Sequence, residues 1–281
     1  MKEKQVPERQ VLTDTSKVTM TSLLKKAPLL LIGKMEVLLL LSTLYGIIAG
    51  VAMFGITRAL QPIIANPDID VVEAKAILET VGDRLPVTAL IILLVNSALL
   101  LPFMRLLVDA VPFEGGWKKF FVRFGRIFAL QITALALFLA FLITLSIIFG
   151  ILSVILPSTA LLVIVLTLAF AGMLTIFTVA HVAILGEAID SRTSLILAWH
   201  MIRPLIMPIA AAYGAIKITS MLLSSFITMI LAGLVATFDL IWLPSMIGEA
   251  IGFAAQILHL AACLWATQAI MNQRKNNRDQ P

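Results

Sequence analysis

The sequence FEGGWKKFFVRFGR, residues 113–126, is a polar break in the middle of a very apolar chain. Its basic residues alternate with aromatic ones, so a helix formed here would lie in a membrane surface. A pair of long apolar segments precedes the break, and further long apolar segments follow it. This arrangement predicts a chain that crosses a membrane several times and returns to one surface in the middle.

The composition supports a membrane protein. Of the 281 residues, 60% are hydrophobic and only 13% are charged, whereas soluble domains carry about 25% charged residues. The apolar residues fall into blocks of about 20 or more, the length that a helix needs to cross a bilayer. The short alternating segments of a transmembrane β-barrel are absent. We therefore predict an all-α polytopic membrane protein.

Six transmembrane helices in three hairpins are predicted. Their approximate bounds are 37–60, 86–107, 127–156, 159–185, 205–236 and 245–271. Residues 22–271 form a single transmembrane domain, between a disordered cytoplasmic segment (1–21) and a cytoplasmic tail (272–281).

Short sequence motifs indicate turns, helix ends and a close helix contact. Residues 61–85 form a mildly acidic outer loop, in which Asp70 and Glu73 resemble a capping box for a short helix ending at Gly82. Pro157 and Ser158 indicate a tight hairpin. Gly46 and Gly50 form a GxxxG pair that allows another helix to approach closely, and packing within the chain is the favoured use.

The distribution of positive charge predicts the orientation. Seventeen of the 21 Lys and Arg residues lie in the N-terminal segment, the second-to-third connection, the fourth-to-fifth connection or the tail. Cytoplasmic loops carry the excess of Lys and Arg. Both termini are therefore predicted to be cytoplasmic.

A threefold pattern accompanies the spans. A short basic amphipathic segment precedes each pair of spans, with Lys34, Arg126 and Arg203 at similar places just before the span. One interpretation is a unit used three times, in which a short basic interfacial helix leads into a hairpin. The other is that every odd-numbered span begins at the cytoplasm and so follows positive charge. The sequence leaves both open.

The layout resembles a known group of proteins. The motifs are Ser-Leu-x5-Met-Ile-Arg-Pro-Leu at 194–205 and Lys-Lys-x3-Arg-x2-Arg at 118–126. Six spans with basic helices before each pair are similar to the YciC-like bacterial inner-membrane proteins and to the membrane domains beside some glycerophosphodiester phosphodiesterases. The resemblance implies the inner membrane of a bacterium and a role in envelope or membrane homeostasis. No phosphodiesterase domain is present, so catalysis does not carry over.

Polar residues inside the spans are the first candidates for a site, because they are costly in hydrocarbon. Lys217, Asn96, His259 and Gln256 each lie well inside a predicted span. If they converge at one depth, they form a midplane polar site for an ion or small molecule, with His259 as a titrating group. The alternative is structural: amides join helices, a lone His packs, and Lys extends toward the headgroups. Both interpretations remain open.

Basic residues at the predicted surface form a second candidate site. Lys118, Lys119, Arg123, Arg126 and Arg203 are placed to contact anionic lipid headgroups. Their alternative role is to set topology alone.

Catalytic signatures are missing from the sequence. It has no HExxH, CxxC, Walker-type or GxSxG motif, and its single cysteine, Cys263, cannot form an intramolecular disulfide. We predict no cofactor, no metal and no catalytic residue. The favoured function is a non-enzymatic accessory role through lipid or protein contacts, without nucleic acid. A small permease or channel is second, and a membrane-bound enzyme third.

Overall fold

The computed structural model of the chain describes residues 18–66, 69–153, 158–189, 191–238 and 242–278. Within these ranges all regular elements are helices, and six helices are long and apolar enough to cross a membrane. The prediction of an all-α, six-span fold is confirmed. The six long helices are α2 (Met35–Ala65), α3 (Val71–Leu107), α4 (Gly116–Leu152), α5 (Ser158–Ala188), α7 (Ile206–Phe238) and α8 (Trp242–Arg278).

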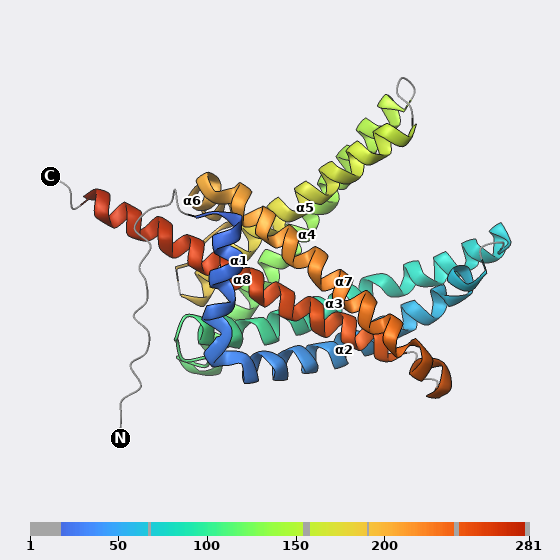
Figure 1. Cartoon of the computed structure of the whole chain (residues 1–281), viewed down its shortest axis with the longest axis horizontal. Helices are drawn as coiled ribbons and strands as arrows, with labels where there is room; N and C mark the ends of the chain where they lie inside the picture. The colour runs from blue at the N-terminus through green and yellow to red at the C-terminus, as the bar shows by residue number, and fades with distance from the viewer. Residues whose placement is uncertain (1–17, 67–68, 154–157, 190, 239–241, 279–281) are drawn as a thin grey trace.

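Two short helices precede long ones. α1 (Met20–Leu31) begins with a capping box between Thr19 and Ser22, and the 3₁₀ turn η2 (Ile32–Lys34) separates it from α2. α6 (Leu195–Ile202) and the 3₁₀ turn η3 (Arg203–Leu205) likewise precede α7. α1 crosses α8 at a steep angle in Figure 1. The predicted placement of α1 and α6 in a membrane surface stays a prediction.

The middle basic stretch does not form a separate helix, so that part of the prediction is wrong. α4 runs from Gly116 to Leu152 without a break. Gly115 and Gly116 have φ of 84° and 72°, a left-handed conformation that glycine adopts at little cost. The chain therefore turns before the basic residues, and these residues form the first turns of the span itself.

The predicted outer loop at 61–85 is also wrong. α2 continues to Ala65 and α3 begins at Val71, so only a short connection separates them. α3 runs through Gly82, where the sequence predicted an end, and the Asp70 side chain makes no capping hydrogen bond. The added turns pack on α2, where Arg84 donates to the carbonyl of Gly55 over 3.5 Å. Helix pairing here outweighs the local stop signals.

Several predictions fall on residues outside the described ranges. They include residues 1–17 of the predicted disordered segment, Pro157 of the predicted hairpin turn, and parts of the connections after α2 and α7. The three-hairpin arrangement and the threefold repeat therefore stay predictions. The predicted tail is described as far as Arg278, where it continues α8 as a helix.

α8 lies at the centre of the bundle. It packs against α1, α2, α5 and α7. Half of the residues in the most apolar stretch of α8 are buried, compared with 6% of those in the most apolar stretch of α4. Alanines on α8 allow this close packing, because small side chains let helices approach in a membrane; fully buried ones are Ala261, Ala262, Ala266 and Ala269. At the ends farthest from α6, the α2–α3 pair and the α4–α5 pair point in different directions, while the two helices of each pair stay side by side (Figure 1).

The GxxxG pair on α2 faces α8. A Cβ added at Gly46 would lie 2.5 Å from the carbonyl oxygen of Met246, and one added at Gly50 would lie 2.6 Å from the Met246 Cα. Neither position has space for a methyl group. The prediction that these glycines pack within the chain is confirmed.

Candidate functional site

A polar cluster joins three helices inside the bundle. His181 of α5, Tyr213 of α7 and His259 of α8 are all buried. The rings of Tyr213 and His259 stack with centroids 4.1 Å apart, and His181 meets both rings edge-on at 5.6 and 5.1 Å. Stacked and edge-to-face pairs of this kind are favourable ring geometries. The three helices therefore share one aromatic and polar junction.

Further polar contacts surround the two histidine rings. The His259 Nε2 lies 3.4 Å from the Thr178 hydroxyl and 3.4 Å from the Cys263 Sγ. The His181 Nε2 lies 3.4 Å from the Gln256 amide nitrogen. Both Nδ1 atoms are buried without a hydrogen-bond partner among the described residues. The hydrogen-bonding groups of the cluster are therefore only partly paired. Each buried unpaired group costs roughly 1–3 kcal/mol of stability.

A charged pair of residues lies beside this cluster. The Lys217 ammonium lies 5.8 Å from the centroid of the Tyr213 ring, within the range of a cation–π interaction. Glu249 of α8 interacts electrostatically with Lys217, although the two make no direct ion pair within the described part of the chain. Opposite charges inside a bundle offset each other's cost in hydrocarbon.

Three of the four residues predicted for the midplane site meet here. Lys217, Gln256 and His259 belong to the same cluster, linked through Tyr213 and His181. The fourth, Asn96, lies on α3 and makes no hydrogen bond to them; its buried amide oxygen has no partner among the described residues. The next residue on α3, Ser97, instead donates to the Gln131 amide oxygen of α4 over 3.0 Å.

Sequence reasoning missed His181, Tyr213 and Glu249 as members of the cluster. No motif or metal-ligand spacing singles out His181 in the sequence. Its signal was only that it is a polar residue within an apolar block, as for His259. Its pairing with His259 depends on the packing of α5 against α8, which spacing along the chain does not reveal.

The geometry of the cluster is that of a packed junction. Rings at 4.1 Å are in direct contact, so these side chains do not face one another across a water-filled space. Within the described residues, no group of three or more His, Cys, Asp or Glu side chains could hold a metal ion. The arrangement can join helices and fix their rotation.

Charged residues from the predicted cytoplasmic segments gather at one end of the molecule. Arg105 is almost fully buried and donates to the carbonyls of Val111 and Ala188 over 2.8 and 3.0 Å. It also pairs with Glu114 at 2.5 Å. The Lys34 ammonium donates to the carbonyl of Leu106 and pairs with Asp109 at 2.9 Å. The starts of α2 and α4 are thereby tied to the ends of α3 and α5.

The first turns of α4 form an exposed basic and aromatic surface, the α4 surface, made of Trp117, Lys118, Lys119 and Phe121. All four side chains are exposed, Trp117 by 67% and Phe121 by 61%. The Trp117 ring lies 6.1 Å from that of Phe121. Aromatic rings beside Lys are typical of the headgroup level of a membrane.

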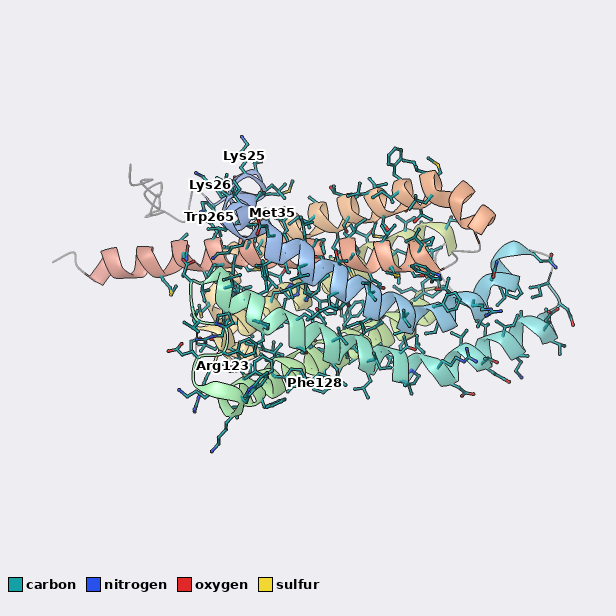
Figure 2. All side chains as sticks on the ribbon, turned by 90° about the horizontal axis from the view of Figure 1, so that it is seen from below. Lys25, Lys26, Met35, Arg123, Phe128 and Trp265 are labelled. Carbon is teal, nitrogen blue, oxygen red and sulfur yellow. The ribbon has the colours of Figure 1, made fainter. Side chains whose placement is uncertain are left out.

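The other predicted headgroup contacts lie in different surroundings. Arg123, labelled in Figure 2, is buried and donates to the Glu114 carbonyl over 3.0 Å. Arg126 pairs with Glu187 of α5 at 3.3 Å, and these two line a cavity of about 310 Å³ with Arg192. Arg203 is exposed in η3. Buried Arg123 holds the loop before α4, so its guanidinium is not available to a headgroup.

No protein-family model matches the chain, and comparison with curated proteins and with solved structures finds no match. The class defined by the fold is a multi-pass α-helical membrane protein.

Proposed function

We propose that this is a non-enzymatic integral protein of a bacterial inner membrane that contributes to membrane or envelope homeostasis through contacts with anionic lipid or with other membrane proteins. Both termini are cytoplasmic in this proposal, because the N-terminal segment and the tail are among the segments richest in Lys and Arg. The resemblance to YciC-like proteins is part of the proposal and supports the bacterial location. The absence of catalytic motifs from the sequence supports a role outside catalysis.

The α4 surface is the observation that carries this function. Lys118 and Lys119 are exposed, as are the neighbouring Trp117 and Phe121. Each Lys near an anionic leaflet contributes about 1 kcal/mol of attraction, and exposed aromatic rings prefer the headgroup level. The same end holds exposed Arg203. A surface of this composition favours anionic lipid over zwitterionic lipid.

The experiment compares the thermal stability of the purified protein with phosphatidylglycerol and with phosphatidylcholine. Phosphatidylglycerol is expected to raise the midpoint of unfolding more, and added salt is expected to reduce the difference, because surface charges are screened. The variant Lys118→Gln/Lys119→Gln is expected to lose about 2 kcal/mol of the preference. The matched control is Arg58→Gln/Lys75→Gln, which removes two exposed charges from α2 and α3, far along the chain from the α4 surface. Equal preference in both variants would contradict the proposal.

A small permease or channel is the second candidate. It is favoured by the meeting of Lys217, Gln256 and His259 inside the bundle. Polar residues there commonly mark a path for an ion or substrate. The direct ring contacts between Tyr213 and His259 favour a dry junction instead. The two functions differ in whether water reaches Lys217.

A further inference from the structure

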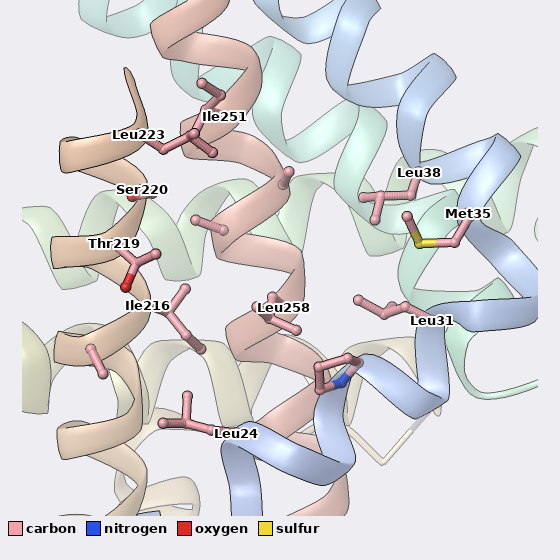
Figure 3. Close-up of a pocket in the computed structure, with 14 residues that line it drawn as sticks. Leu24, Leu31, Met35, Leu38, Ile216, Thr219, Ser220, Leu223, Ile251 and Leu258 are labelled. Carbon is pink, nitrogen blue, oxygen red and sulfur yellow. The ribbon is translucent and has the colours of Figure 1, made fainter. Parts of the chain in front are cut away.

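An apolar cavity opens where α1 crosses the long helices. Its volume is about 460 Å³, and α1, the start of α2, α7 and α8 contribute its walls. Figure 3 shows Leu24 and Leu31 on one side of the space, with Ile216 and Leu258 beside them. We call it the α1 groove. Its volume lies within the roughly 300–1,000 Å³ typical of sites for small ligands.

The walls of the α1 groove suit a hydrocarbon ligand. They follow α7 from Ala215 to Leu223, about 12 Å at 1.5 Å per residue. The hydroxyls that reach the lining are those of Thr219 and Ser220, and Ser220 donates to the carbonyl of Lys217 over 2.8 Å. A space lined by alkyl groups and left empty would lose dispersion contacts on every wall.

The end of the groove formed by α1 is different in character. Lys25 is exposed and has no ion-pair partner among the described residues. It directly follows Leu24 and lies one helical turn before Pro28, and both of these residues line the groove. A cation therefore lies beside the apolar space.

We propose that the α1 groove binds one acyl chain of an anionic glycerophospholipid, with its phosphate at Lys25. The charge of Lys25 selects an anionic headgroup, and the alkyl walls select the chain. A bound lipid of this kind joins α1 to α7 and α8. The groove is separate from the α4 surface, so this proposal does not rest on the proposed function.

Native mass spectrometry of the whole protein tests the proposal, with phosphatidylglycerol and phosphatidylethanolamine of equal chain length as probes. Ala254→Phe places a ring in the groove, because Ala254 is one of its lining residues. The matched control is Ala136→Phe, at an exposed alanine of α4. Lys25→Gln removes the charge without filling the groove, and it serves as the second variant because it changes only an exposed side chain.

The wild-type protein and Ala136→Phe are expected to retain one phosphatidylglycerol molecule that Ala254→Phe loses. Lys25→Gln is expected to bind phosphatidylglycerol about fivefold more weakly, with its affinity for phosphatidylethanolamine unchanged. Retention of the lipid by Ala254→Phe would overturn the site. An unchanged preference for phosphatidylglycerol in Lys25→Gln would overturn the proposed headgroup contact. Neither result depends on Lys118 or Lys119.

Discussion

At the scale of single residues, the main feature is a group of buried polar side chains where α5, α7 and α8 meet. The Tyr213 and His259 rings stack, His181 meets both edge-on, and the Nδ1 of each histidine has no hydrogen-bond partner among the described residues. Their contacts join three helices, at the cost of two unpaired nitrogens. A junction of this kind fixes which faces of α5, α7 and α8 meet.

The sequence predicted part of this junction. Lys217, Gln256 and His259 stand out because each interrupts an apolar block. Asn96 stands out for the same reason, but it makes no hydrogen bond to them, and its amide oxygen has no partner among the described residues. A polar residue within a span can be identified from the sequence as a candidate for the junction. Whether it reaches the junction depends on how its helix is rotated about its axis. Helix rotation follows from contacts between segments far apart in the chain.

A prediction at this scale concerns the glycines of α2. Gly46→Ala is expected to destabilise the protein by about 1–3 kcal/mol, because its methyl group would overlap Met246 and Ala250. Thermal unfolding in detergent measures the change. The control is Gly252→Ala on α8, where an added Cβ meets nothing within 4 Å. This control is expected to be neutral or slightly stabilising, since alanine is the better helix former. Equal effects of the two substitutions would show that α2 does not pack on α8 through Gly46.

At the scale of elements, the helices are longer than their apolar cores. α3 begins at Val71 and α4 at Gly116, so residues predicted as loop or interfacial helix instead extend the spans. The signals that misled were local: Gly82 for α3, and the basic residues at 118–126 for α4. Neither signal breaks a helix on its own, because a single glycine costs only about 1 kcal/mol and Lys and Arg are good helix formers. The turn before α4 was decided by Gly115 and Gly116, which adopt left-handed φ.

A prediction at this scale concerns Arg105, which holds the connection between α3 and α4. Arg105→Met keeps the bulk but leaves the carbonyls of Val111 and Ala188 without their donor. The protein is expected to lose about 3 kcal/mol of stability, and limited proteolysis at residues 108–115 is expected to become faster.

The matched change is Glu114→Gln, at the exposed partner of Arg105. It is expected to cost less than Arg105→Met, because the Gln amide oxygen can still accept from Arg105 and the two hydrogen bonds of Arg105 to backbone carbonyls remain. If Glu114→Gln proved as damaging as Arg105→Met, the ion pair would be the main stabilising contact of this connection. The two hydrogen bonds to backbone carbonyls would then be secondary.

At the scale of the whole molecule, α8 is the axis on which α1, α2, α5 and α7 pack, and several charged residues of the predicted cytoplasmic segments meet at one end. Composition alone predicted six spans, which the structure has. The orientation that the Lys and Arg pattern indicates stays a prediction. The central position of α8 was not predictable in the same way. Its alanines resemble those of any apolar helix until partners from α1, α2, α5 and α7 are placed around it.

The proposed function requires a dry polar junction inside the bundle and an accessible α4 surface at the cytoplasmic side. The most direct test is labelling of Lys217→Cys, in a Cys263→Ser background, with a membrane-impermeant thiol reagent in inverted and right-side-out vesicles. Lys119→Cys is the control, since position 119 is exposed at the basic end. We predict that Lys119→Cys is labelled in inverted vesicles only and that Lys217→Cys is protected in both. Labelling of Lys217→Cys would mean that water reaches the junction, which contradicts a dry junction and favours the permease.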